Sequence, residues 1–170
     1  MADPEQSWEI VPLSSLHETV SFCSGEKQLD VYLRKWAVLN QQEDMGRTYV
    51  LVKPWQARVW GYYTITNSKV AKASLPPEEQ FSANYPVPAI LIGKLALDQA
   101  VRRKGLGKRL LMDALKRCQT IALQSAVRGV EVDAVDHVAE GFYTKYGFRR
   151  LTDKPLHLYL SMRVIRRLCL

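Results

Sequence analysis

The stretch RRKGLGKRLL, Arg102 to Leu111, decides the fold. Five of its ten residues are cationic, and two glycines, Gly105 and Gly107, stand two positions apart in its middle. A surface that only attracts nucleic acid needs cations and has no use for paired glycines. The flanking sequence explains them, because the continuously apolar run Ala89–Asp98 comes before the glycines and predicts a strand buried on both faces. A helical stripe of apolar residues follows them, made of Leu106, Leu110, Leu111, Ala114, Leu115, Cys118, Ile121 and Ala122.

A glycine turn between a strand and a helix forms an anion site. The first turn of a helix has unpaired N–H groups and carries the positive end of the dipole. Gly105 and Gly107 remove Cβ atoms where a phosphate would touch the backbone, and the surrounding cations are Arg102, Arg103, Lys104 and Lys108. We therefore predict a pyrophosphate cradle. It is not a Walker A loop, because Arg109 replaces the Ser or Thr, and it lacks the third glycine of a Rossmann fingerprint. The hexapeptide alone is also compatible with an ordinary glycine turn before a cationic helix.

The rest of the chain alternates between helix and strand patterns, which predicts an α/β fold. Apolar residues from Leu29 to Ala37, Trp36 among them, recur on one helical face, and Asp136–Tyr146 predicts a short helix ended by Gly147. Four prolines make Ser74–Pro88 a long loop. The further strands are expected at Trp8–Pro12, Thr48–Lys53, Arg58–Thr66, Val127–Val135 and His157–Met162. No repeat or linker divides the chain, so we expect residues 1–170 to form a single domain.

Length and composition fit a globular protein with an anionic partner. The 170 residues are 47% hydrophobic and 24% charged, with a formal net charge of +7. No run reaches the ~18 apolar residues of a membrane span, and the polar start MADPEQSWEIV is not a signal peptide. We expect a cytoplasmic protein whose three cysteines, Cys23, Cys118 and Cys169, are reduced thiols. Their spacing predicts no metal site.

A second motif, AEGFYTKYGF at Ala139–Phe148, stands about thirty residues after the glycines. Together with KLALDQAVRRKGLGKRLLMDAL, it resembles the GCN5-related N-acetyltransferase (GNAT) family. The resemblance implies a central mixed, mostly antiparallel twisted sheet flanked by helices, and an acetyl-CoA cosubstrate whose pyrophosphate binds at Arg102–Lys108, including the backbone of Leu106. It also implies that the backbones of Leu95 and Leu97 pair with the pantetheine arm. Asp136 stands where many members carry an Asn that contacts this arm, and Asp cannot donate unless protonated.

The same resemblance assigns the general acid to Tyr143. A phenol with an ordinary pKa near 10 protonates a departing thiolate, whose thiol has a pKa near 8.5. Without the resemblance, a half-buried helix tyrosine with an ordinary hydrogen bond is the better explanation of Tyr143. Tyr146 is a lesser candidate, which we expect to pack against Phe148. No general base stands out, because His17, His137 and His157 are scattered along the chain. Glu131 and Asp133 share one strand face, where a site-lining role competes with a salt-bridged one.

The N-terminal half narrows the resemblance further. FCSGEKQLDVYLRKWA (Phe22–Ala37), WGYYTIT and the proline-rich loop are similar to the acetyltransferase toxins of type II toxin–antitoxin modules, the TacT- and AtaT-like proteins. The resemblance implies acetylation of the α-amine of aminoacyl-tRNA, which blocks translation, and it implies a homodimer and a ribbon-helix-helix antitoxin. An α-amine with a pKa near 8 is already partly neutral at pH 7, so it needs little help from a base.

Two other functions stay open: acetylation of a small amine or a protein N-terminus, and a non-enzymatic module that binds nucleic acid. A tRNA substrate requires cations that contact its phosphates. The candidates outside the cradle are Arg34, Lys35, Lys72, Arg149, Arg150, Arg163, Arg166 and Arg167.

Overall fold

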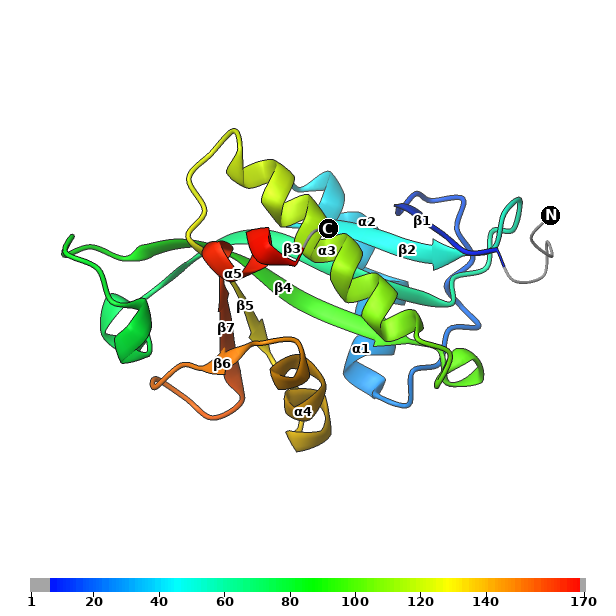
Figure 1. Ribbon diagram of the computed structural model, residues 1–170. Helices are drawn as coiled ribbons and strands as arrows, with labels where there is room; N and C mark the ends of the chain where they lie inside the picture. Colours follow the sequence, from blue (N-terminus) through cyan, green and yellow to red (C-terminus); the bar gives the residue numbers. More distant parts are fainter. Residues whose placement is uncertain (1–6, 169–170) are drawn as a thin grey trace. The chain divides into compact units, whose positions relative to one another are not determined.

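The computed structural model describes residues 7–168, and Figure 1 traces them from blue to red. Cys169 lies outside the described residues. The strands are β1 (Glu9–Pro12), β2 (Arg47–Val52), β3 (Gly61–Val70), β4 (Val87–Leu97), β5 (Gly129–Asp133), β6 (Arg149–Arg150) and β7 (His157–Ser161). The α-helices are α1 (Lys27–Val31), α2 (Ala37–Gln42), α3 (Leu106–Ala122), α4 (His137–Lys145) and α5 (Met162–Arg167). No helix within residues 7–168 is long and apolar enough to cross a membrane.

The strands form one seven-stranded mixed sheet in the order β1-β2-β3-β4-β5-β7-β6. β4 and β5 are parallel, whereas the pairs β1–β2, β2–β3, β5–β7 and β6–β7 are antiparallel. The predicted α/β class with a mostly antiparallel sheet is therefore confirmed. The helix that we predicted after the glycines is α3, and Leu110, Leu111, Ala114, Leu115 and Cys118 of its stripe are fully buried.

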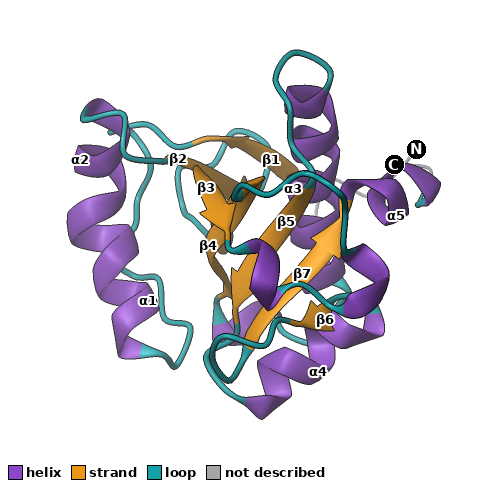
Figure 2. Ribbon diagram, turned by 90° about the vertical axis from the view of Figure 1, so that its left-hand side faces the viewer, coloured by secondary structure: helices purple, strands orange, loops and turns teal. Residues whose placement is uncertain are grey.

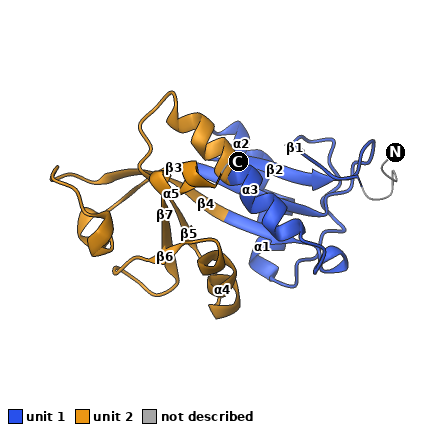
Figure 3. Ribbon diagram, viewed as in Figure 1, with its two compact units in different colours: residues 1–66, 94–114 blue, residues 67–93, 115–170 orange. Residues whose placement is uncertain are grey.

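The chain folds into two compact units (Figure 3). Unit 1 comprises the residues up to Thr66 together with Lys94–Ala114, and unit 2 comprises Asn67–Gly93 and the residues from Leu115 onward. β3, β4 and α3 each contribute to both units, because the boundaries fall inside these elements. The single domain over residues 1–170 therefore remains a prediction.

Unit 1 contains the N-terminal helical segment, in which α1 continues into α2 through a π-helical turn at Tyr32–Trp36 (Figure 2). Leu33 and Ala37 are 1% exposed and pack in a core with Phe22, Val50 and Tyr62. Our prediction that Trp36 lies on the buried face is wrong, because its side chain is 48% exposed. A π turn holds more residues than an α turn, so it shifts the helical face that follows.

Unit 2 is built on β5 and β7, which pair from Gly129↔Ser161 to Asp133↔His157. Our strands Val127–Val135 and His157–Met162 are confirmed as the shorter β5 and β7. Position 129 requires glycine, because a Cβ built there would lie 2.3 Å from the ring of Tyr159. β6 and α5 were not predicted. The expected loop at Ser74–Pro88 contains a 3-10 turn at Pro77–Glu79, and β4 begins at Val87.

Candidate active site

The glycine turn is held in place by Asp98, which follows β4 and is 4% exposed. Its Oδ1 accepts a hydrogen bond from the Ala100 N–H at 2.9 Å, and its Oδ2 accepts one from the Cys23 N–H at 3.1 Å. These bonds fix the 3-10 turn Gln99–Val101, from which the chain passes to the start of α3 at Leu106. The sequence Asp-x-Ala therefore forms an Asx cap that positions the cradle relative to its strand.

Gly105 has the backbone conformation that the prediction required. Its φ is +74°, in the left-handed region that favours glycine, and a Cβ built on it meets no atom within 4 Å. The next residue, Leu106, is buried and anchors the first turn of α3. The open space in front of Gly105 therefore fits a ligand phosphate that approaches the backbone, as a pyrophosphate cradle needs.

The cations of the turn flank Gly105 in the chain. Arg103, Lys104 and Lys108 are exposed. Arg102 is also exposed, and its guanidinium donates a hydrogen bond to the carbonyl of Ser24. The structure thus brings the predicted residues 102–108 together in unit 1.

Leu95 and Leu97 lie in β4 beyond the residues that pair with β5. The parallel ladder runs from Ala89↔Gly129 to Ile92↔Val132, while β4 continues to Leu97. A strand-like cosubstrate arm can pair only where β5 does not, and the pairing of Leu95 and Leu97 with such an arm stays a prediction.

Tyr143 lies on α4 and is 7% exposed. Its ring packs edge to face against Phe142 and Phe148, at centroid distances of 5.2 and 5.4 Å. Burial raises the pKa of the Tyr143 hydroxyl above its ordinary value of 10, because a phenolate would be poorly solvated there. The hydroxyl therefore keeps its proton at neutral pH and can act as a donor.

The two neighbouring predictions on α4 have different outcomes. Asp136 is the N-cap of the helix, and its Oδ1 accepts a hydrogen bond from the Ala139 N–H at 2.7 Å. This role as a helix cap does not test its predicted contact with the cosubstrate. The ring of Tyr146 packs edge to face against Phe142, with the ring centroids 5.3 Å apart. We had expected Tyr146 to pack against Phe148.

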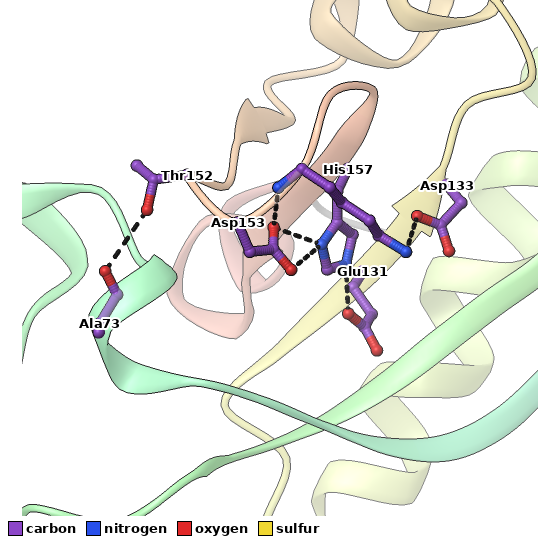
Figure 4. A network of polar contacts seen from close by, with 7 residues as sticks. Ala73, Glu131, Asp133, Thr152, Asp153 and His157 are labelled. Atoms are coloured by element: carbon purple, nitrogen blue, oxygen red, sulfur yellow. Dashed lines mark hydrogen bonds and ion pairs between the residues drawn. The ribbon is translucent and has the colours of Figure 1, made fainter.

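A buried charged cluster in unit 2 was not foreseen from the sequence. Figure 4 shows His157 between two carboxylates: Nδ1 lies 2.8 Å from Asp153 and Nε2 lies 2.6 Å from Glu131. Each ring nitrogen of His157 therefore faces a carboxylate oxygen. Burial alone would favour protonation of Asp153, but the hydrogen bond and charge of His157 outweigh it and lower the pKa of Asp153.

Glu131 and Asp133 therefore belong to a salt-bridged face, the commoner of the two alternatives, since Lys154 Nζ lies 3.0 Å from Asp133. His157 has no ring nitrogen left to accept a proton from a substrate. His137, at the first position of α4, lies 3.3 Å from Glu140 and is largely exposed. No group of three or more His, Cys, Asp or Glu within the described part of the chain could hold a metal ion.

Several cations that we proposed for tRNA have acidic partners. Arg149 lies 2.5 Å from Glu78, Arg163 lies 3.3 Å from Glu79, and Arg150 binds both oxygens of Glu140 at 2.6 Å. The pKa of Glu140 is lowered to about 2, first by the hydrogen bonds from Arg150. Each of these carboxylates neutralises its arginine locally, so the arginine attracts a phosphate less strongly than an unpaired one would. The count of cations in the sequence therefore overstates the surface available to tRNA.

A mixed sheet with a glycine turn at a helix N-terminus, open in front of Gly105, is an arrangement that suits an α/β enzyme with a phosphate-bearing cosubstrate. The family model described as acetyltransferase (GNAT) domain matches residues 24–157, and the chain belongs to this family.

Relatives of the whole chain are similar to it over most of their length. A tRNA-acetylating toxin of Mycobacterium tuberculosis (strain ATCC 25618 / H37Rv) is 36% identical over 156 residues, 92% of this chain and 93% of the toxin. The probable toxin TacT of Sinorhizobium fredii (strain NBRC 101917 / NGR234) is 32% identical and covers 89% of each chain.

Solved structures show the same fold. A tyrosine-to-phenylalanine mutant of KacT superposes with a TM-score of 0.91 at 25% identity, over 96% of this chain and 99% of the other. AtaTR bound with acetyl-CoA has a TM-score of 0.85 at 25% identity, over 96% of this chain and 98% of the other.

Proposed function

We propose that this protein is the toxin of a type II toxin–antitoxin system and that it transfers acetyl from acetyl-CoA to the α-amine of aminoacyl-tRNA. The acetylated amine can no longer form a peptide bond, so translation stops. As a member of the GNAT family the protein is an acetyl-CoA-dependent N-acetyltransferase. The acceptor rests on one observation, the 36% identity over 92% of this chain to a protein named tRNA-acetylating toxin.

The cosubstrate is assigned to the glycine turn. The N–H groups around Gly105 and Gly107 bind the pyrophosphate, with Arg102, Arg103, Lys104 and Lys108 neutralising its charge and Leu106 fixing the helix start. The backbones of Leu95 and Leu97 pair with the pantetheine arm, and we assign Asp136, the N-cap of α4, to a contact with the same arm. When bound, acetyl-CoA supplies the thioester that the acceptor amine attacks.

Tyr143 is the general acid in this proposal. The acceptor amine would form the carbon–nitrogen bond as the carbon–sulfur bond breaks, and the thiolate that leaves would take the proton of the Tyr143 hydroxyl. The proton that the acceptor nitrogen loses would pass to solvent, from which the Tyr143 phenolate would be protonated again. A phenol with a raised pKa is a weaker acid, but a thiolate formed in the same dry surroundings is also a stronger base, so the transfer remains favourable.

The acceptor suits a site without a dedicated base. His157 is occupied on both ring nitrogens by Asp153 and Glu131. An α-amine with an ordinary pKa of 7.7–8.0 is on the order of a tenth neutral at pH 7, against less than a thousandth of a lysine amine. The reaction with an aminoacyl end therefore needs no proton acceptor from the chain before attack.

We also propose the partners and the location. AtaT has been solved with the C-terminus of the antitoxin AtaR, and KacTA with DNA. We extend these pairings to a ribbon-helix-helix antitoxin for this chain, a homodimer, a cytoplasmic location, and a single catalytic domain over residues 1–170.

The test is transfer of labelled acetyl from acetyl-CoA to total charged tRNA, beside uncharged tRNA and a panel of lysine peptides, small amines and protein N-termini. We expect label only on charged tRNA, and its loss when the aminoacyl bond is hydrolysed. Label on peptides or small amines alone would keep the acetyltransferase and reject the toxin.

A further inference from the structure

A pocket in unit 1 adjoins the glycine turn and shares Lys104, Gly105 and Leu106 with the cradle. Its volume is about 630 Å³, and its other walls are Ala100, Val101, Arg109, and three residues that flank strands: Trp8 before β1, Lys53 after β2 and Trp60 before β3. None of the described residues that line it is acidic. Its size falls in the range of small-ligand sites, roughly 300–1,000 Å³.

The walls of the pocket combine indole rings with cations. Trp8 and Trp60 meet edge to face with their centroids 6.3 Å apart. The ammonium of Lys53 lies 5.6 Å from the Trp8 ring, and the guanidinium of Arg58 lies 3.8 Å from the Trp60 ring. Arg109 donates one hydrogen bond to the Trp8 carbonyl at 2.5 Å, and a guanidinium has further N–H groups for a phosphate.

A third indole, Trp55, stands two residues after the lining residue Lys53, in the turn that joins β2 to β3. It is 103% exposed and has a φ of +64°, a left-handed conformation that is strained for a bulky residue. The turn is closed by a hydrogen bond from the Gln56 N–H to the Lys53 carbonyl at 3.1 Å. A strained backbone that holds a large apolar side chain in water indicates a binding role.

We propose that this aromatic–basic pocket, together with Trp55, binds an unpaired nucleotide of the RNA substrate. Trp55 stacks on the base, and Lys53 and Arg109 contact the adjacent phosphates, while Lys104 stays with the cosubstrate. The proposal rests on the proposed function, because it takes tRNA as the substrate. An acidic peptide would need the cations alone, whereas the pairing of cations with two half-buried indoles and the exposed Trp55 matches a base and its phosphate.

Two variants test the pocket with different signatures in the binding of uncharged tRNA across a salt series. Trp55→Ala should weaken binding roughly 5- to 150-fold, the range for one lost stacking contact, and leave the slope of log K against log salt unchanged. Lys53→Ala should lower the magnitude of that slope by about 0.7–0.9, the share of one phosphate contact. The matched controls are Trp36→Ala, at the other exposed tryptophan, and Lys116→Ala, at an exposed lysine on α3.

The outcomes separate this proposal from the proposed function. Acetylation of charged tRNA by the wild type, with unchanged tRNA affinity in both pocket variants, overturns the pocket and keeps the function. A wild type that acetylates no charged tRNA overturns the function, while the pocket is still judged by the affinity for uncharged tRNA. If Trp55→Ala weakens the binding of acetyl-CoA, the pocket belongs to the cosubstrate. If Trp55→Ala weakens the binding of the antitoxin and leaves tRNA binding unchanged, the pocket binds a peptide. Either result overturns the proposal.

Discussion

Gly105 offers a direct test of the cradle, because its Cβ direction is open and its φ is +74°. Replacing it by Gln and by Glu introduces side chains of the same size with the same backbone strain, roughly 1–2 kcal/mol. The pair therefore differs only in charge. A carboxylate about 4 Å from a phosphate charge costs roughly 1 kcal/mol in water and roughly 4 kcal/mol at a partly shielded surface. We expect acetyl-CoA to bind Gly105→Glu on the order of 10- to 1,000-fold more weakly than Gly105→Gln.

The assay is isothermal titration calorimetry with acetyl-CoA, accompanied by thermal unfolding of both variants. Equal melting temperatures would establish that the two proteins are equally folded, so that their dissociation constants can be compared. The difference should shrink as salt is added, because the site is exposed to solvent. Equal dissociation constants for Glu and Gln would refute the reasoning, since no pyrophosphate could then lie in front of residue 105.

The fold gives two further predictions. Gly129→Ala should destabilise the protein by roughly 1–3 kcal/mol in urea unfolding, because its Cβ would overlap the ring of Tyr159, which is 1% exposed; an unchanged midpoint would contradict the packing. Glu140 has an ordinary pKa of 4.5 that falls to about 2 beside Arg150, so its contribution to stability is present above pH 4.5 and is lost as the pH falls to 2. Arg150→Gln should flatten the stability profile in that window, and an unaltered profile would exclude the pair as its cause.

Local patterns predicted the elements that carry the cosubstrate site. The strand, glycine turn and helix at β4–α3 depend on residues within about thirty positions of one another, and the helix predicted at Asp136–Tyr146, which is α4, depends on a still shorter stretch. Hydrophobic periods and helix ends depend on neighbouring residues, so they can be predicted from the sequence without knowledge of the fold.

The parts that escaped prediction depend on contacts between distant residues or on weak local signals. Glu131, Asp153 and His157 come from β5, the loop before β7, and β7, and no spacing reveals that they meet. The two-residue strand β6 exists only through its pairing with β7, and α5 is too short for a helical period. The pocket beside Trp8 is missed for the same reason, because it joins residues about a hundred positions apart.

The central claim is that Tyr143 donates the proton to the thiolate while acetyl moves to charged tRNA. The measurement is single-turnover acetyl transfer to aminoacyl-tRNA by Tyr143→Phe, with Tyr146→Phe on the same helix as the matched control and acetyl-CoA affinity measured for both. We predict that Tyr143→Phe slows transfer roughly 10²- to 10⁴-fold at unchanged affinity, while Tyr146→Phe stays near the wild-type rate. A wild-type rate in Tyr143→Phe would contradict the account.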